Sequence, residues 1–239
     1  MSLILNIETA TEICSVSLAK EGKLIALKEH KEGLQHARLL TVYIEEIFNE
    51  NGVSIKELNA VAVSKGPGSY TGLRIGVSAA KGIAYAGNIP LIAISTLQAM
   101  AHGIAANSNF HENTWLCPMI DARRMEVYSA FFDLGNKQQK EISADIIDEN
   151  SYAEILSQHQ VVFFGNGAQK CKNAIQSPNA QFIDNTLCSA ENMVKLSYEA
   201  FKNNHFEDVA YFEPFYLKDF IATIPRKIYF RKLKDFLVS

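Results

Sequence analysis

Along the first 105 residues the spacing of apolar side chains switches between a period of two residues, typical of strands, and a period of 3.6 residues, typical of helices. Few folds can accommodate the order in which these segments follow one another. Three short segments with the period of a strand come first, and their connections are too short for anything but antiparallel pairing. Helical segments then alternate with two short apolar segments, the pattern of parallel strands joined by helical crossovers. The predicted strands are 3–7, 14–20, 24–28, 59–64 and 90–94, and the predicted helices are 35–51, 73–86 and 95–105.

An antiparallel meander followed by two right-handed crossovers is the topology of the half-domain found in ribonuclease H-like and actin-like proteins. A polar segment at 107–113 interrupts the pattern, and the chain then restarts. We therefore predict an α/β protein with two lobes of the actin-like, ribonuclease H-like fold, the second lobe being degenerate. After the interruption we expect strands at 115–120, 127–132 and 161–164 and helices at 151–158 and 191–203. The predicted domains are 1–106, 107–217 and a basic tail at 218–239.

The composition narrows the class of protein. A net charge of −3 gives no strong overall attraction to nucleic acid or acidic membranes. Residues 82–111 contain no Asp, Glu, Lys or Arg, but Asn88 and Pro90 interrupt them, so no membrane segment is predicted. The chain opens without a basic, cleavable signal and its four cysteines are scattered, which favours free thiols in the cytoplasm. The six histidines show no metal-ligand spacing and there is no GxSxG motif, so neither a metal site nor a serine hydrolase is expected.

The glycine-rich segment 66–72 connects a predicted strand to a predicted helix, a position where backbone N–H groups can bind an anion. It is not a P-loop, because Leu73 and Arg74 follow its last glycine, and Thr71 stands where a dinucleotide-binding fingerprint needs glycine. The alternative is a tight turn capped by Ser69 or Thr71, with small residues that allow close packing. The pattern favours the packing alternative.

Two helices carry the apolar character of an interface. The segment 35–51 has a wide apolar stripe, and Gly72, Gly76, Ala80 and Ala84 form a ridge of small residues along the next helix. Such a ridge lets another helix approach closely, within the chain or on another subunit. We predict that the isolated chain dimerises through these helices. The predicted partner-binding residues are Leu39, Leu40, Tyr43, Ile44, Ile47, Gly72, Arg74, Ile75, Gly76, Ala79, Ala80 and Ile83.

The turn after the first strand offers a second possible site. In actin-like kinases and ATPases this turn holds an acidic residue near the metal and a glycine that lets the backbone approach phosphate. Here Glu8 is longer than the usual Asp and Ala10 replaces the glycine. A hairpin turn with Thr11 as a local hydrogen-bonding residue is the alternative. We interpret the region as the remnant of a nucleotide site, made of Glu8, Thr9, Thr11, Gly66 and Gly68.

Four segments, in order along the chain, resemble the signature blocks of the TsaB family, formerly called YeaZ. They are ILNIETAT at 4–11, KGPGSYTGLRIG at 65–76, DARRMEVY at 121–128 and PFYLK at 214–218. The block GPGSYTGLRIG is highly specific, and the matches span most of the chain. Considered by itself, the acidic and basic run 121–126 is a salt-bridged turn between strands.

The resemblance implies a two-lobed actin-like (ASKHA) fold and a place in the complex that installs threonylcarbamoyl on the tRNA adenosine beside the anticodon. It implies a non-catalytic subunit that pairs with a TsaD-like transferase through its N-terminal helices, self-associates when alone and supports assembly with a TsaE-like ATPase. It implies contact with tRNA only through the complex. It also implies no metal and no cofactor of its own, with ATP used by the complex rather than hydrolysed by this chain.

Two other functions remain open. A small-molecule kinase or ATPase of the same fold would use Glu8 for magnesium and 66–72 for phosphate, but the sequence after residue 105 has no DxGxT-like block. A homodimeric binding module would differ from the subunit that the resemblance implies only in its partner.

The tail from Lys218 carries six basic and two acidic residues, a net charge of +4, whereas the rest of the chain carries −7. It is either an arm that binds RNA or a segment docked by its aromatic residues, and the pattern favours docking.

Overall fold

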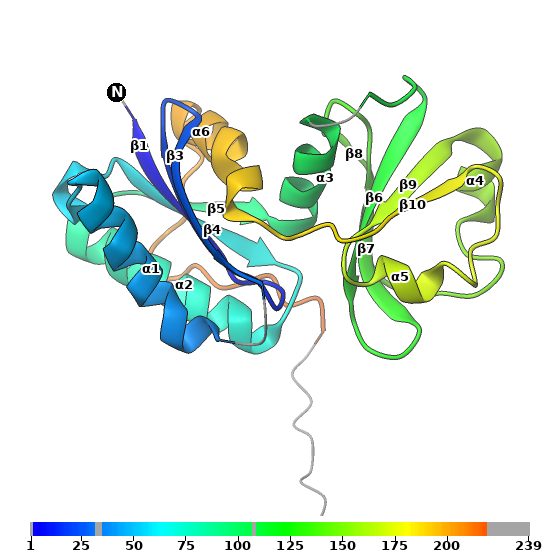
Figure 1. Ribbon diagram of the computed structural model, residues 1–239, viewed down its shortest axis with the longest axis horizontal. Coiled ribbons are helices and arrows are strands. Elements are labelled where there is room, and N and C mark those ends of the chain that lie inside the picture. The colour runs from blue at the N-terminus through cyan, green and yellow to red at the C-terminus, as the bar shows by residue number, and fades with distance from the viewer. Residues whose placement is uncertain (1, 32–34, 107–108, 219–239) are drawn as a thin grey trace, which may run out of the picture.

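The computed structural model describes residues 2–31, 35–106 and 109–218, which form two β-sheets with helices around them (Figure 1). The predicted tail lies outside the described residues except for Lys218, as does part of the predicted boundary at 107–113. The first sheet holds β1 (Leu3–Glu8), β2 (Cys14–Lys20), β3 (Lys23–His30), β4 (Ala60–Gly66) and β5 (Leu91–Ser95). The second holds β6 (Thr114–Asp121), β7 (Glu126–Phe132), β8 (Gln138–Ile146), β9 (Gln160–Phe164) and β10 (Ala180–Ile183).

The two sheets have the same topology. The first has the order β3-β2-β1-β4-β5, with β1, β2 and β3 antiparallel and β1, β4 and β5 parallel. The second has the order β10-β9-β6-β7-β8, in which β6, β7 and β8 are antiparallel and β6, β9 and β10 are parallel. The strand order predicted for the first lobe is therefore confirmed. The second lobe keeps the same order and is reduced only in its helices.

The helices cover the sheets unevenly. The helical elements are α1 (His36–Asn51), η1 (Ile55–Glu57), α2 (Tyr70–Gly87), α3 (Thr96–Ala106), α4 (Ala153–Gln158), α5 (Ala168–Cys171), η2 (Ala190–Met193) and α6 (Val194–Lys202). Helices α1 and α2 lie side by side on one face of the first sheet, and α3 lies between the two sheets (Figure 1). The side chains of α3 pack against both lobes, because Ala99 joins the core of the first sheet while Leu97 and Met100 join that of the second.

The residue types at the helix ends explain where the helices begin and end. Gly52 follows the last residue of α1 and has φ of 63°, in the left-handed region that favours glycine. The capping box at 54–57 forms, since the Ser54 N–H donates to the Glu57 carboxylate at 2.8 Å. Ser69 caps α2 by accepting a hydrogen bond from the Gly72 N–H at 3.2 Å.

Helix α6 departs from the prediction. We placed the helix at 191–203 in the second lobe, but α6 packs against β1 and β5 of the first sheet, on the face opposite α1 and α2. Two buried serines of β2 fix this return of the chain: the Ser17 hydroxyl donates to the Ala190 carbonyl at 3.0 Å, and the Ala190 N–H donates to the Ser15 hydroxyl at 2.9 Å. The domain limits at 106 and 217 remain predictions.

None of the helices in the described ranges combines the length and the apolar character that a bilayer crossing requires. The four cysteines are free and buried, as expected for thiols that belong to the core.

Candidate functional site

A cleft of about 640 Å³ lies between the two lobes, and we call it the interlobe cleft. Its walls come from the β1–β2 turn, the β4–α2 loop, the β6–β7 turn, the loop after β9 and the last described segment of the chain. The fold brings together at this cleft the four segments in which the sequence resembles the TsaB family, and the loop after β9 adds Asn166. The lining residues are Ala10, Thr11, Glu12, Pro67, Gly68, Ser69, Tyr70, Thr71, Ile120, Asp121, Ala122, Arg123, Tyr128, Asn166, Phe215, Tyr216, Leu217 and Lys218.

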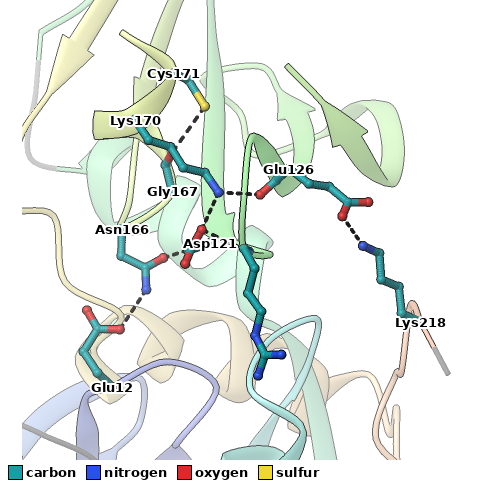
Figure 2. A network of polar contacts seen from close by, with 9 residues as sticks. Glu12, Asp121, Glu126, Asn166, Gly167, Lys170, Cys171 and Lys218 are labelled. Carbon is teal, nitrogen blue, oxygen red and sulfur yellow. Dashed lines mark hydrogen bonds and ion pairs between the residues drawn. The ribbon is translucent and has the colours of Figure 1, made fainter. Parts of the chain in front are cut away.

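Figure 2 shows the polar network that bridges the cleft. Asn166 connects the lobes, because its amide donates to the Glu12 carboxylate at 2.7 Å and its side-chain oxygen accepts the Asp121 N–H at 3.0 Å. Lys170 forms an ion pair with Asp121 and donates to the Glu126 carbonyl at 2.6 Å. The run 121–126 is a turn between strands, as predicted, but its acids pair with Lys170 of α5 and with Lys218 rather than with the arginines of the run.

The glycine-rich loop packs tightly against the β1–β2 turn. The Ser69 N–H donates to the Ala10 carbonyl at 2.6 Å, and a Cβ atom on Gly68 would overlap that same carbonyl. Two of the amide groups at the start of α2, those of Ser69 and Gly72, are thus already engaged within the chain. This geometry agrees with the packing alternative and does not fit a phosphate cradle.

Glu8 points into the protein rather than into the cleft. Its side chain is 1% exposed, and its carboxylate accepts hydrogen bonds from the Ala10 N–H at 2.6 Å and the Ser64 hydroxyl at 2.8 Å. Burial raises the pKa of this carboxyl to about 7, although the hydrogen bonds act in the opposite direction. A carboxylate that is buried and hydrogen-bonded within the protein is not placed to bind a magnesium ion in the cleft. In the described ranges no three His, Cys, Asp or Glu side chains are placed to hold a metal ion.

The other residues of the predicted nucleotide remnant also make packing contacts. The Thr9 hydroxyl donates to the Gly72 carbonyl at 2.8 Å, and the Thr11 carbonyl accepts a hydrogen bond from the buried ring of His36 at 2.7 Å. Gly66 has φ of 109°, and a Cβ there would lie 2.7 Å from the Phe215 carbonyl. The fold gathers the five residues at one end of the cleft, but only Thr11 and Gly68 line it.

Half of the predicted partner-binding residues are buried within the chain itself, so for them the prediction was wrong. These residues are Leu40, Ile44, Ile47, Gly72, Gly76 and Ala80. The two glycines of the ridge let α2 pack against the β1–β2 turn of its own lobe: a Cβ on Gly72 would overlap the Thr9 carbonyl, and one on Gly76 would overlap the Thr9 hydroxyl. The period of a helix shows which face is apolar, but not whether the chain or a partner covers it.

The other half reaches the surface along the line where α1 meets α2. Leu39 and Tyr43 from α1 and Ile75, Ala79 and Ile83 from α2 pack against the core and remain partly exposed. We call these five residues the α1–α2 seam. Arg74, the sixth, is exposed beside the seam, and its guanidinium donates to the Tyr70 hydroxyl at 3.2 Å. The seam consists of apolar side chains that stay partly exposed on two adjacent helices, which is the expected composition for the centre of a protein–protein interface.

Several residues of the cleft were not predicted as site residues. Asp121 and Arg123 belong to a segment that we interpreted as a turn, and Lys218 to the tail. Asn166 and Lys170 gave no signal, because their importance depends on contacts with residues more than 40 positions away.

The comparisons with known proteins agree with this architecture. The family model described as TsaD, tRNA N6-adenosine threonylcarbamoyltransferase, matches residues 31–226. The TsaB protein of Escherichia coli K12, described as a tRNA threonylcarbamoyladenosine biosynthesis protein, is 31% identical over 230 residues, which cover 92% of this chain and 96% of that relative. The chain belongs to the TsaB family.

Other relatives support the assignment of family and fold. The solved structure of YeaZ from Pseudomonas aeruginosa superimposes with a TM-score of 0.77 at 26% identity, covering 91% of this chain and all of that one. The threonylcarbamoyltransferase of Bacillus subtilis is 33% identical over 107 residues, which cover 38% of this chain and 31% of that enzyme. The predicted actin-like α/β fold is confirmed.

Proposed function

We propose that this chain is the non-catalytic partner of a TsaD-like transferase in the threonylcarbamoyladenosine modification of tRNA, at the adenosine next to the anticodon. The observation that carries the proposal is the α1–α2 seam, an apolar strip that the chain's own fold leaves partly exposed. Its relatives named TsaB are biosynthesis proteins of the same modification, and part of the chain is similar to the transferase itself. The chain acts as a dimerisation scaffold.

The proposal extends to the other members of the assembly. The seam pairs with the TsaD-like subunit in the complex and with a second copy of this chain in isolation. A TsaE-like ATPase joins the complex, which uses ATP. This chain contacts tRNA only as part of that complex. We place the chain in the cytoplasm, in accord with a tRNA substrate. Two observations support the proposal that the chain has no cofactor of its own. Glu8 is buried, and the glycine-rich loop 66–72 packs against the β1–β2 turn.

The same two features disfavour the alternative of a small-molecule kinase or ATPase. We expect the purified chain not to turn over ATP, because Glu8 faces the interior and the amides of Ser69 and Gly72 are engaged. Phosphate release at steady state is the measurement. Hydrolysis well above a blank without protein, lost in Glu8→Gln, would favour the kinase alternative instead.

The seam predicts where association is most sensitive. Ile75→Glu places a charge in the seam, and we expect it to weaken both self-association and binding to the TsaD-like subunit by at least about tenfold. Light scattering and co-purification with the transferase measure the two effects. Ile146→Glu is the matched control, because Ile146 is 76% exposed on β8 of the other lobe. Equal behaviour of the two variants would show that the interface lies elsewhere.

A further inference from the structure

The turn between β6 and β7 carries two adjacent arginines in an unusual backbone conformation. Arg123 has φ of 70° and Arg124 has φ of 49°, so both lie in the left-handed region. Positions with positive φ favour Gly and Asn, because a larger side chain with a Cβ is strained there. Two arginines thus occupy positions that the local backbone disfavours for them, which points to a role for their side chains.

The acidic side chains of this turn are neutralised by other residues. Asp121 pairs with Lys170, and Glu126 pairs with Lys218 (Figure 2). Within the described residues, the guanidinium groups of Arg123 and Arg124 make neither an ion pair nor a hydrogen bond. Both arginines are exposed, and Arg123 lines the interlobe cleft. The tip of the hairpin therefore carries two positive charges that the chain itself does not compensate.

The contact of Lys218 with Glu126 places the beginning of the basic tail at the same hairpin. The ammonium group of Lys218 also lies 5.9 Å from the centre of the Tyr128 ring on β7. Beyond this point the sequence contains five more basic residues and two acidic ones. The chain thus joins its most basic segment to its uncompensated pair of arginines, although its remainder carries −7.

We propose that the Arg123–Arg124 hairpin binds the phosphate backbone of tRNA in the assembled complex; the proposal rests on the proposed function. Guanidinium groups present planar pairs of N–H donors that match phosphate oxygens, and each contact releases condensed counterions. The hairpin belongs to the second lobe and the α1–α2 seam to the first, so a transferase bound at the seam leaves the arginines accessible.

The test removes both charges while keeping the turn. Arg123→Asn with Arg124→Gly introduces residues that tolerate positive φ, so the hairpin is retained without its cations. Arg123→Lys with Arg124→Lys keeps the charge. Lys20→Gln with Lys23→Gln is the matched control, because these two exposed lysines flank the β2–β3 hairpin at the opposite end of β2 from the cleft. tRNA affinity is measured over a range of salt, for the complex with the transferase and for the chain alone at low salt.

We expect the Asn-Gly variant to bind tRNA about tenfold more weakly near 0.1 M salt, with a salt dependence shallower by about one to two units in log–log slope. The Lys20–Lys23 control should bind like the natural chain. The lysine variant should keep the natural salt dependence but bind more weakly than the natural chain, because an ammonium group cannot make the paired contact of a guanidinium. An unchanged affinity and slope in the Asn-Gly variant overturns the proposal. Loss of assembly with the transferase in that variant also overturns it, because the hairpin would then be a protein contact. If the natural chain does not assemble, the proposed function fails, and the titrations of the chain alone still decide the role of the hairpin.

Discussion

Gly72→Ala should lower the free energy of unfolding by about 1–3 kcal/mol, although alanine is the better helix former. The added Cβ would overlap the Thr9 carbonyl, which belongs to the backbone of the β1–β2 turn and cannot rotate away. Helix α2 would then have to move off the sheet that it covers. Gly76→Ala should act in the same direction, because its Cβ would overlap the buried Thr9 hydroxyl.

Gly82→Ala is the matched control on the same helix. A Cβ at Gly82 meets no atom within 4 Å, so only the helix preference remains, and we expect this variant to be more stable by about 1 kcal/mol. Urea unfolding of the purified variants gives the three free energies. If Gly72→Ala were as stable as Gly82→Ala, the small residues of α2 would not be explained by its contact with the β1–β2 turn.

Where the fold depends on neighbours in sequence, it was predictable. The antiparallel meander follows from two short connections, and the ends of the helices follow from Gly52, the capping box at Ser54 and the cap at Ser69. Each of these involves atoms within about four positions along the chain, so the residue types alone determine the outcome.

What depends on distant contacts was not predictable. The strands β8 and β10 lie at the edges of the second sheet and lack the apolar alternation of buried strands, so they were missed. The stripe on α1 gave the correct apolar face, but Leu40, Ile44 and Ile47 are covered by the chain's own sheet. Which part of such a stripe stays at the surface is decided by how far the sheet extends beneath the helix.

The candidate site was likewise predictable only where it depends on local sequence. The four segments that resemble the TsaB family meet at the interlobe cleft, so the resemblance identified its walls. The contacts that hold the cleft together, from Asn166 to Glu12 and from Lys170 to Asp121, join residues that are distant in sequence. The buried position of Glu8 was also hidden, because the pattern shows an acid after a strand but not the direction of its side chain.

The burial of Glu8 makes the stability of the chain depend on pH. The carboxyl has its ordinary pKa of 4.5 when the chain is unfolded and a pKa of about 7 when it is folded. Between these values the folded chain retains a proton that the unfolded chain has released. The contribution of Glu8 to stability is therefore fully present below pH 4.5 and is lost as the pH rises through 7. Over this window the loss amounts to about 3 kcal/mol.

Glu8→Gln should remove this pH dependence. Glutamine stays neutral at every pH, and its side-chain oxygen can still accept the hydrogen bonds from the Ala10 N–H and the Ser64 hydroxyl. We expect the variant to gain about 3 kcal/mol relative to the natural chain between acidic and mildly alkaline pH. Unfolding by urea at a series of pH values measures the difference, and Glu45→Gln, at an exposed position of α1, controls for the change in net charge. Parallel curves for Glu8→Gln and the natural chain would mean that the Glu8 carboxyl is ionised in the folded protein throughout the window, and so faces water or a cation rather than the interior.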